Sequence, residues 1–177
     1  MMAKAYFVTG IGTDVGKTIV SSILVNQLKA DYWKPIQAGD LHQTDSMKIK
    51  KWCQDVYIHP ERYKLSQPMS PHAAAERDNI LIELEEFSFP QTDNHLIVEG
   101  AGGLLVPIND NHMVIDLIAY LGIEVILVSQ HYLGSINHTL LSLEALQNRQ
   151  IPIAGIIFNG DENKDTESII TSTYDIK

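Results

Sequence analysis

Cysteine is nearly absent from this 177-residue chain, in which Cys53 is the one thiol. A single cysteine excludes an intrachain disulfide and a cysteine-rich metal site, and it suits a reducing compartment. We therefore expect a cytoplasmic protein in which Cys53 is a small buried residue. Basic residues are also scarce, with 13 Lys and Arg against 22 Asp and Glu and a net charge of −9. Nucleic acids and anionic membranes require a basic face, so neither is an expected partner and any anion site must be local.

Long apolar runs are missing as well. No stretch approaches the length of a membrane span, and the segment 1–8 is too short for a signal peptide. Hydrophobic residues make up 45% of the chain and charged residues 20%, which is typical of a globular domain with a sizeable core. No repeat or low-complexity segment divides the sequence, so we expect one domain over residues 1–177.

The strongest signal is the loop sequence GIGTDVGKT at residues 10–18. It follows an apolar run and precedes apolar positions at helical spacing that end near Lys29, so it joins a buried strand to a helix N-terminus. Unpaired N–H groups there, with the charge of Lys17, attract phosphate, and the hydroxyl of Thr18 suits Mg²⁺. Five residues separate Gly10 from Gly16, one more than in the usual phosphate loop. An ordinary glycine-rich turn is the alternative, but we predict nucleotide binding.

Two charged residues, Lys34 and Asp45, follow the loop, and the sequence around each of them allows either a structural or a functional role. Residues 32–36 predict a short strand that delivers Lys34 to a turn marked by Pro35 and Gly39. A lysine at that edge is solvated or, in an open parallel sheet, lies where ligands bind. Residues 43–46 predict a helix N-cap, which is the simplest role for Asp45.

A third strand, His95–Glu99, ends in a carboxylate and is followed by Gly100-Ala101-Gly102-Gly103. Downstream of a phosphate loop, an acidic residue at a strand end is where a Mg²⁺-linked carboxylate is expected. The small residues indicate close approach of the backbone to a ligand. Glu99 facing water is the alternative, and we favour the metal role.

The remaining patterns predict an α/β fold, a parallel β-sheet with helices on both faces like the three-layer sandwich of P-loop NTPases, with the site along the carboxyl ends of the strands. Ser135 either caps a helix or offers exposed amides to a carboxylate, and His72 is either a surface residue or a pocket wall. The predicted segments are an extended piece at 62–65, helices starting at Ser70-Pro71 and covering 80–87, 114–120, 134–147 and 165–173, and strands at 125–128 and 151–158.

Several of these segments, taken together, resemble the sequence pattern of the dethiobiotin synthetases. They follow one another in the order of that family along nearly the whole chain. The E-G-A-G-G run and a G-x-x-N-H helix start at residues 134–138 are more specific than the phosphate loop. The other segments are 10–18, Lys34-Pro35, Asp45 and Asn159. The resemblance implies an ATP-dependent ligase that closes a cyclic urea on 7,8-diaminononanoate (7,8-diaminopelargonic acid) with CO₂, giving dethiobiotin, ADP and phosphate.

The resemblance also implies roles for individual residues. Lys17 and Lys34 would be catalytic and face the transferred phosphoryl group, while Thr18, Asp45 and Glu99 would arrange Mg²⁺ directly or through water. Asn159 would read the nucleotide base, and the start of the 134–147 helix would bind the substrate's distal carboxylate across a homodimer interface, so that the active site needs two chains. Implied nucleotide contacts are Gly12, Thr13, Asp14, Val15, Gly16, Lys17, Thr18, Glu99, Gly100, Ala101, Gly102 and Asn159, and implied substrate contacts are Ala38, Gly134, Ser135, Ile136 and Asn137.

Two positions depart from the family pattern. Ala38 stands where many relatives carry a hydroxyl thought to touch substrate, so that contact is missing, supplied elsewhere or made by the backbone. The chain stops at Lys177, whereas relatives usually continue through another strand, a Leu-Gly-Arg-like turn and a closing helix that help enclose the base. We therefore expect either a shortened chain or looser base recognition.

Two other functions compete with the synthetase. A nucleotide-dependent switch or partitioning ATPase of the same superfamily typically has a second lysine at the position of Gly12, and that lysine is absent. A catalytically inactive binding protein is the third reading, and the presence of Lys17, Thr18, Asp45 and Glu99 argues against it.

Overall fold

Six parallel strands form the central sheet of the computed structural model, which describes residues 3–174. Their order across the sheet is β4-β2-β6-β1-β7-β8, and β3 and β5 pair in a separate two-stranded sheet. The strands are β1 (Ala5–Gly10), β2 (Asp31–Trp33), β3 (Ile36–Ala38), β4 (Ile58–His59), β5 (Tyr63–Leu65), β6 (Leu96–Gly103), β7 (Glu124–Gln130) and β8 (Ile153–Asn159).

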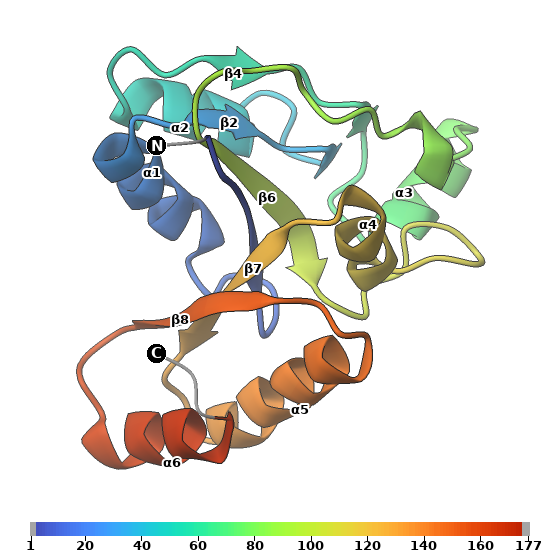
Figure 1. Ribbon diagram of the computed structural model, residues 1–177. Helices are drawn as coiled ribbons and strands as arrows, with labels where there is room; N and C mark the ends of the chain where they lie inside the picture. Colours follow the sequence, from blue (N-terminus) through green and yellow to red (C-terminus); the bar gives the residue numbers. More distant parts are fainter. Residues whose placement is uncertain (1–2, 175–177) are drawn as a thin grey trace.

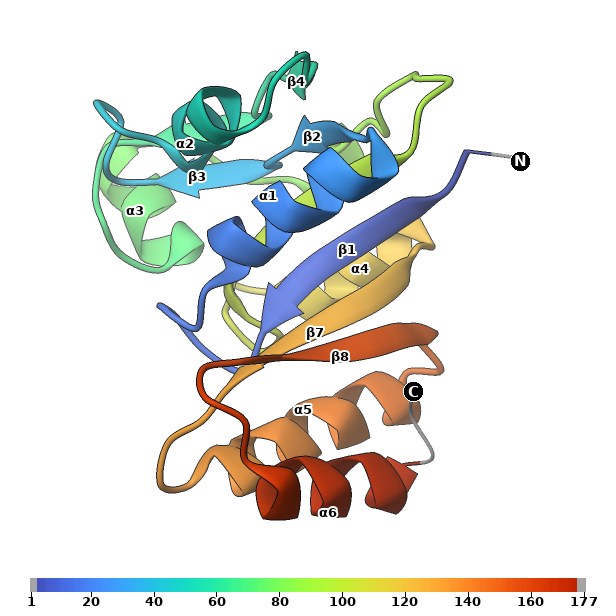
Figure 2. The ribbon, with the colours of Figure 1, turned by 90° about the vertical axis from the view of Figure 1, so that its left-hand side faces the viewer.

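Helices cover both faces of the central sheet (Figure 1). In β1, Phe7 belongs to one apolar cluster and Val8 to the other, because successive side chains of a strand point to opposite faces. Figure 2 shows one helix in front of β1 and another behind it. The helices α1 (Lys17–Leu28) and α2 (Asp45–Trp52) pack on the Val8 side, and α3 (Pro71–Asp78), α4 (Val114–Leu121), α5 (Ser135–Asn148) and α6 (Lys164–Tyr174) pack with the Phe7 cluster. The predicted fold class is confirmed.

The predicted strand at 32–36 is divided into β2 and β3, which belong to different sheets. Lys34 and Pro35 separate them, and a proline cannot donate to a strand ladder. The carbonyl of Pro35 instead accepts from the amides of Arg62 and Tyr63, at 2.9 and 3.1 Å. The break turns the chain at Lys34, next to the carboxyl end of β2.

The helix predicted at 80–87 is wrong, since only Leu84–Glu86 form a short 3₁₀ turn there. Asn79, in the left-handed region at φ 54°, ends α3. Beyond it, the carbonyl of Ile82 accepts from the side-chain amide of Asn109 at 2.8 Å, and the amide of Glu83 donates to the hydroxyl of Tyr63 at 3.1 Å. Side chains from distant segments satisfy this backbone, so a helix is not needed.

Several smaller features complete the fold. Cys53 is buried as expected, with 2% of its surface exposed. The extended piece at 62–65 is β5, and Pro71 is the first residue of α3, also as expected. Strand β4 has only two residues and no sequence pattern indicated it. Within residues 3–174, no helix is both long and apolar enough to cross a membrane.

Candidate active site

The loop between β1 and α1 is held by a hydrogen bond from a residue at the end of β8, an outer strand of the same sheet. Asn159, the last residue of β8, donates from Nδ2 to the carbonyl oxygen of Val15 at 3.0 Å. Gly16, the N-cap of α1, has φ 94°, and a Cβ there would lie 2.3 Å from Asn159 Nδ2. Only glycine fits this position, because a side chain would both strain the backbone and displace Asn159.

Lys17 folds back over the loop. Its Nζ donates to the carbonyl oxygen of Gly12 at 2.7 Å, and the residue is buried. Burial, followed by repulsion from Lys34, lowers the pKa of Lys17 from 10.5 to about 8. The loop therefore contains an ammonium group that an anion such as phosphate would stabilise.

The lowered pKa of Lys17 predicts proton uptake on nucleotide binding. If the bound phosphates keep Lys17 protonated, uptake per nucleotide should rise from about a quarter of a proton at pH 7.5 to about nine-tenths at pH 9.0, because the free amine gains its charge as it binds. Calorimetric titrations of ADP in buffers of different ionisation enthalpy measure this number. Equal uptake at both pH values would contradict the lowered pKa.

The centre of the site is the carboxylate of Glu99, which is 1% exposed. Its Oε1 accepts from Thr18 Oγ1 at 2.8 Å and from Lys34 Nζ at 3.2 Å, and its Oε2 accepts from the hydroxyl of Tyr32 at 3.0 Å. Lys34 Nζ also lies 2.7 Å from Asp45 Oδ2. Side chains from four segments, the start of α1, the end of β2, the start of α2 and strand β6, thus meet beside the phosphate loop.

These contacts exclude the solvated alternative for Lys34 and Glu99 and the capping alternative for Asp45, and their roles toward ligands stay predictions. Lys34 and Glu99 are both buried, so neither faces water. Thr44, not Asp45, caps α2, because its side chain accepts from the amide of Met47 at 3.2 Å. Asp45 is instead free to pair with Lys34.

The electrostatic balance keeps these groups ionised. Burial alone would lower the pKa of Lys34, but the carboxylates of Glu99 and Asp45 outweigh it and raise the pKa above its ordinary value. Burial opposes ionisation of Asp45 too, but Lys34 and then Lys48 lower its pKa to about 2. Three ammonium groups, those of Lys17, Lys34 and Lys48, thus lie near the two carboxylates of Glu99 and Asp45.

Of the small residues that follow Glu99, Gly100 is required by the packing of β6 against its neighbouring strand. Strand β6 continues to Gly103, so Glu99 lies within the strand and not at its end. A Cβ on Gly100 would lie 2.7 Å from Cε1 of Phe7 in the neighbouring strand. Close strand packing requires this glycine, and the predicted ligand contacts of Gly100, Ala101 and Gly102 stay predictions.

The predicted carboxylate-binding segment lies at the start of α5. Gly134 is the N-cap with φ 104°, and Ser135 is buried without its side chain capping the helix. Figure 2 shows this start on the left-hand side of the molecule, where the phosphate loop also lies. Among the described residues no hydrogen bond joins 134–137 to the loop or to Glu99. Ala38 is the last residue of β3, and contacts of 134–137 and Ala38 with substrate stay predictions.

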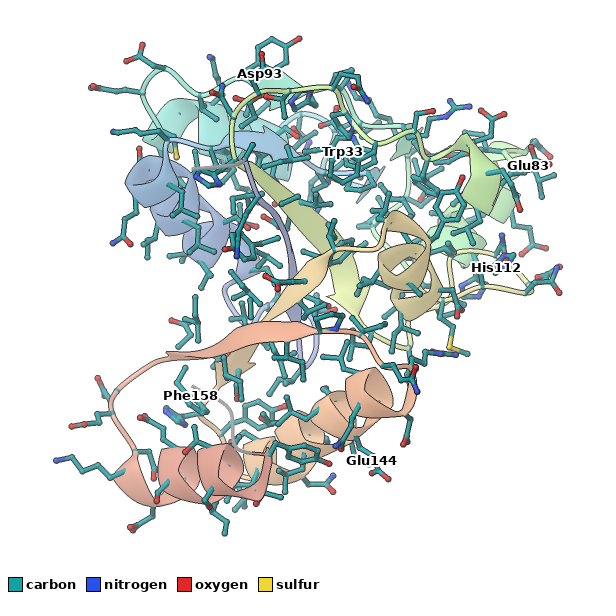
Figure 3. All side chains as sticks on the ribbon, viewed as in Figure 1. Trp33, Glu83, Asp93, His112, Glu144 and Phe158 are labelled. Atoms are coloured by element: carbon teal, nitrogen blue, oxygen red, sulfur yellow. The ribbon has the colours of Figure 1, made fainter. Side chains whose placement is uncertain are left out.

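A pocket of about 490 Å³ lies apart from the cluster around Glu99. Its walls are one side of α3 with His72, Ala75 and Glu76, the segment 80–85 and the loop 108–112. His72 is one of the lining residues, so it is a pocket wall. Figure 3 labels two others, Glu83 and His112, at the right-hand side of the molecule. None of the residues predicted for the active site lines this pocket.

The oxygen atoms around Glu99 fit a magnesium ion. Mg²⁺ prefers hydroxyl and carboxylate oxygens, binds few protein ligands and keeps several waters. Thr18 and Glu99 supply such oxygens side by side, and Asp45 is linked to them through Lys34. Within residues 3–174 no three His, Cys, Asp or Glu side chains lie together as a group that could hold a metal ion by themselves.

Comparisons with solved structures show the fold. A ParA family ATPase from Chlorobium tepidum TLS superposes with a TM-score of 0.55 at 14% identity, covering 95% of this chain and 81% of that one. The signal recognition particle receptor FtsY from Elizabethkingia anophelis gives 0.52 at 14% identity, covering 97% and 55%. At such low identity the likeness concerns the fold alone.

Sequence comparisons are more specific. A family model described as an AAA domain matches residues 4–177. The ATP-dependent dethiobiotin synthetase BioD of Christiangramia forsetii is 54% identical over 99% of this chain and 86% of its own length. The proteins of the same name from Cytophaga hutchinsonii and Agrobacterium fabrum are 54% and 42% identical, over 94% and 96% of this chain and 82% and 81% of their own. With the phosphate loop and the Glu99 cluster in place, the chain belongs to the ATP-dependent dethiobiotin synthetase family.

Proposed function

We propose that this chain is an ATP-dependent cyclo-ligase that converts 7,8-diaminononanoate and CO₂ into dethiobiotin, with ADP and phosphate as the other products. The observation that supports it most strongly is the buried cluster of Lys34, Glu99 and Asp45 next to Lys17 and Thr18. Two lysines beside one phosphate site suit a phosphoryl acceptor that is itself an anion. We include the cytoplasm in this proposal, because one buried cysteine suits a reducing compartment.

The proposed reaction needs no protein nucleophile. One substrate amine captures CO₂ as a carbamate, ATP phosphorylates the carbamate to a mixed anhydride, and the second amine attacks and expels phosphate. Lys17 and Lys34 would neutralise the charge that develops on the transferred group, which is most of the catalysis in phosphoryl transfer. Thr18 and Glu99 would hold Mg²⁺, with Asp45 acting through water, and the ion would supply further positive charge to the phosphates.

Phosphate release from ATP with Mg²⁺ and bicarbonate, with and without 7,8-diaminononanoate, tests this function. The expected result is release that requires the diamine, together with the cyclic urea detected by mass spectrometry. Diamine-independent release would favour a switch ATPase instead. The absence of any release would favour an inactive binding protein.

We also propose that the active enzyme is a homodimer in which the start of α5 completes the partner's site. The argument is the exposure of large side chains next to this segment: Leu133 is fully exposed at 104%, and Tyr132 is exposed at 43%. Apolar side chains gathered before a predicted substrate-binding segment are typical of an interface. A shared site would explain why, among the described residues, 134–137 makes no hydrogen bond to the phosphate loop of its own chain.

Leu133→Asp is therefore expected to dissociate the dimer, because it places a charge in the apolar contact. Analytical ultracentrifugation should show a monomer that still binds ADP, while diamine-dependent turnover falls at least tenfold, about 1.4 kcal/mol. Leu81→Asp is the matched control, since Leu81 is 72% exposed at the pocket of α3. A Leu133→Asp protein that remained dimeric and active would remove this segment from the interface.

A further inference from the structure

One of the three groups that donate to Glu99 is not explained by phosphate or metal binding. Thr18 and Lys34 both contact Oε1. Tyr32 alone among the described residues donates to Oε2, at 3.0 Å. No sequence pattern indicated this role, because a tyrosine in an apolar strand is typical of a core residue.

Strand pairing brings the tyrosine and the carboxylate together. Tyr32 in β2 is paired with Ile97 in β6, two residues before Glu99. Residues two apart in a strand point to the same face, so Glu99 and Ile97 share a face, and Tyr32 belongs to the same apolar cluster as Ile97. The phenol ring thus lies inside the core with its hydroxyl reaching the site.

Neither group can exchange this contact for water, since Tyr32 is 0% and Glu99 1% exposed. An ionised carboxylate only accepts hydrogen bonds, so the tyrosine hydroxyl must donate. Burial, and next the charge of Glu99, raise the pKa of Tyr32 well above 10, which keeps the donor proton in place. Removing the hydroxyl would leave Oε2 buried without a donor and the carboxylate free to rotate.

We propose that Tyr32 is a positioning residue for metal-nucleotide binding: by anchoring Oε2, it fixes the carboxylate rotation that presents Oε1 of Glu99, beside Thr18, to the proposed Mg²⁺. This inference rests on the proposed Mg²⁺ site. Outer partners that orient a metal-binding carboxylate commonly change metal affinity 10–100-fold when they are lost. The tyrosine acts through Glu99 and does not itself touch nucleotide or substrate.

Mn²⁺ binding to the ADP-bound protein, measured by electron paramagnetic resonance, tests the role without turnover. Tyr32→Phe should weaken Mn²⁺ binding about tenfold. The matched control is Tyr63→Phe, which deletes another buried tyrosine hydroxyl with a single partner, the amide of Glu83. This control should lower the melting temperature to a similar extent but leave Mn²⁺ affinity within twofold. Equal Mn²⁺ affinity in wild type and Tyr32→Phe, or equal losses in both variants, would overturn the proposal.

A double-mutant cycle separates positioning from general destabilisation. In a Glu99→Gln background, Tyr32→Phe should change Mn²⁺ affinity by less than twofold, because the oxygen that it orients is no longer an anionic ligand. A full tenfold effect in that background would overturn the proposal as well. The titration of the wild-type protein tests the proposed metal site separately. If the wild-type protein failed to bind Mn²⁺ in the presence of ADP, the assignment of the metal site would be wrong.

Discussion

Replacing Lys34 with methionine is expected to lower phosphate release from ATP by about a thousandfold and to destabilise the fold at the same time. Methionine keeps the unbranched side chain up to the ε position and removes the ammonium group. Glu99 and Asp45 then lose the cation that lies 3.2 and 2.7 Å from them. Breaking a buried ion pair from one side costs about 3–5 kcal/mol, because the remaining carboxylates stay buried.

The loss of turnover and the loss of stability can be separated by changing the pH and by a control variant. Protonating Asp45 removes one of the two negative charges that lose Lys34, so the stability lost in Lys34→Met should be partly regained at low pH. Lys48→Met is the matched control, because Lys48 contacts the other oxygen of the same Asp45 at 3.0 Å but is partly exposed. It should cost about 0.5 kcal/mol in chemical denaturation and leave turnover near wild type. Near-normal phosphate release by Lys34→Met would remove Lys34 from the mechanism.

Gly16→Ala is expected to weaken ADP binding so far that it can no longer be detected. The added methyl group would meet Asn159 Nδ2 at 2.3 Å, and the residue has φ 94°. The backbone can relieve the clash only by turning the N–H groups of the loop away from the phosphate position or by expelling Asn159 from its bond with Val15. Either movement disrupts the loop before a ligand arrives. Equilibrium binding of a fluorescent ADP analogue measures the loss.

Gly122→Ala provides the comparison for strain alone. Gly122 ends α4 at φ 64°, and a Cβ there would meet no atom within 4 Å. This substitution should cost about 1 kcal/mol of stability and leave ADP binding unchanged. If Gly16→Ala bound ADP as tightly as Gly122→Ala, the contact with Asn159 would have no part in shaping the loop.

Features with local causes were predictable from sequence. The phosphate loop depends on a strand, a glycine-rich turn and a helix that follow one another within residues 5–28, and each has its own short-range pattern. The alternation of strands and helices likewise predicted the parallel sheet with helices on both faces. Glu99 was found because it follows an apolar run downstream of that loop.

Features that depend on distant partners were not predictable in the same way. Lys34 is buried only because Glu99, 65 residues later, and Asp45 compensate its charge. Neither its own neighbours nor its position before Pro35 distinguishes a buried lysine from a solvated one. The error at residues 80–87 has the same origin, since Asn109 and Tyr63 supply the hydrogen bonds that a helix would otherwise make internally.

The bond from Asn159 to Val15 links the phosphate loop to the local stability of β8. Within residues 3–174, β8 pairs with β7 on one side only, whereas β1 pairs on both. Amide protons of such an outer strand exchange with solvent through small openings, long before the central strands unfold. Each opening at the end of β8 would withdraw Asn159 from the loop, so any partner that slows exchange in β8 should also keep the loop ordered for nucleotide.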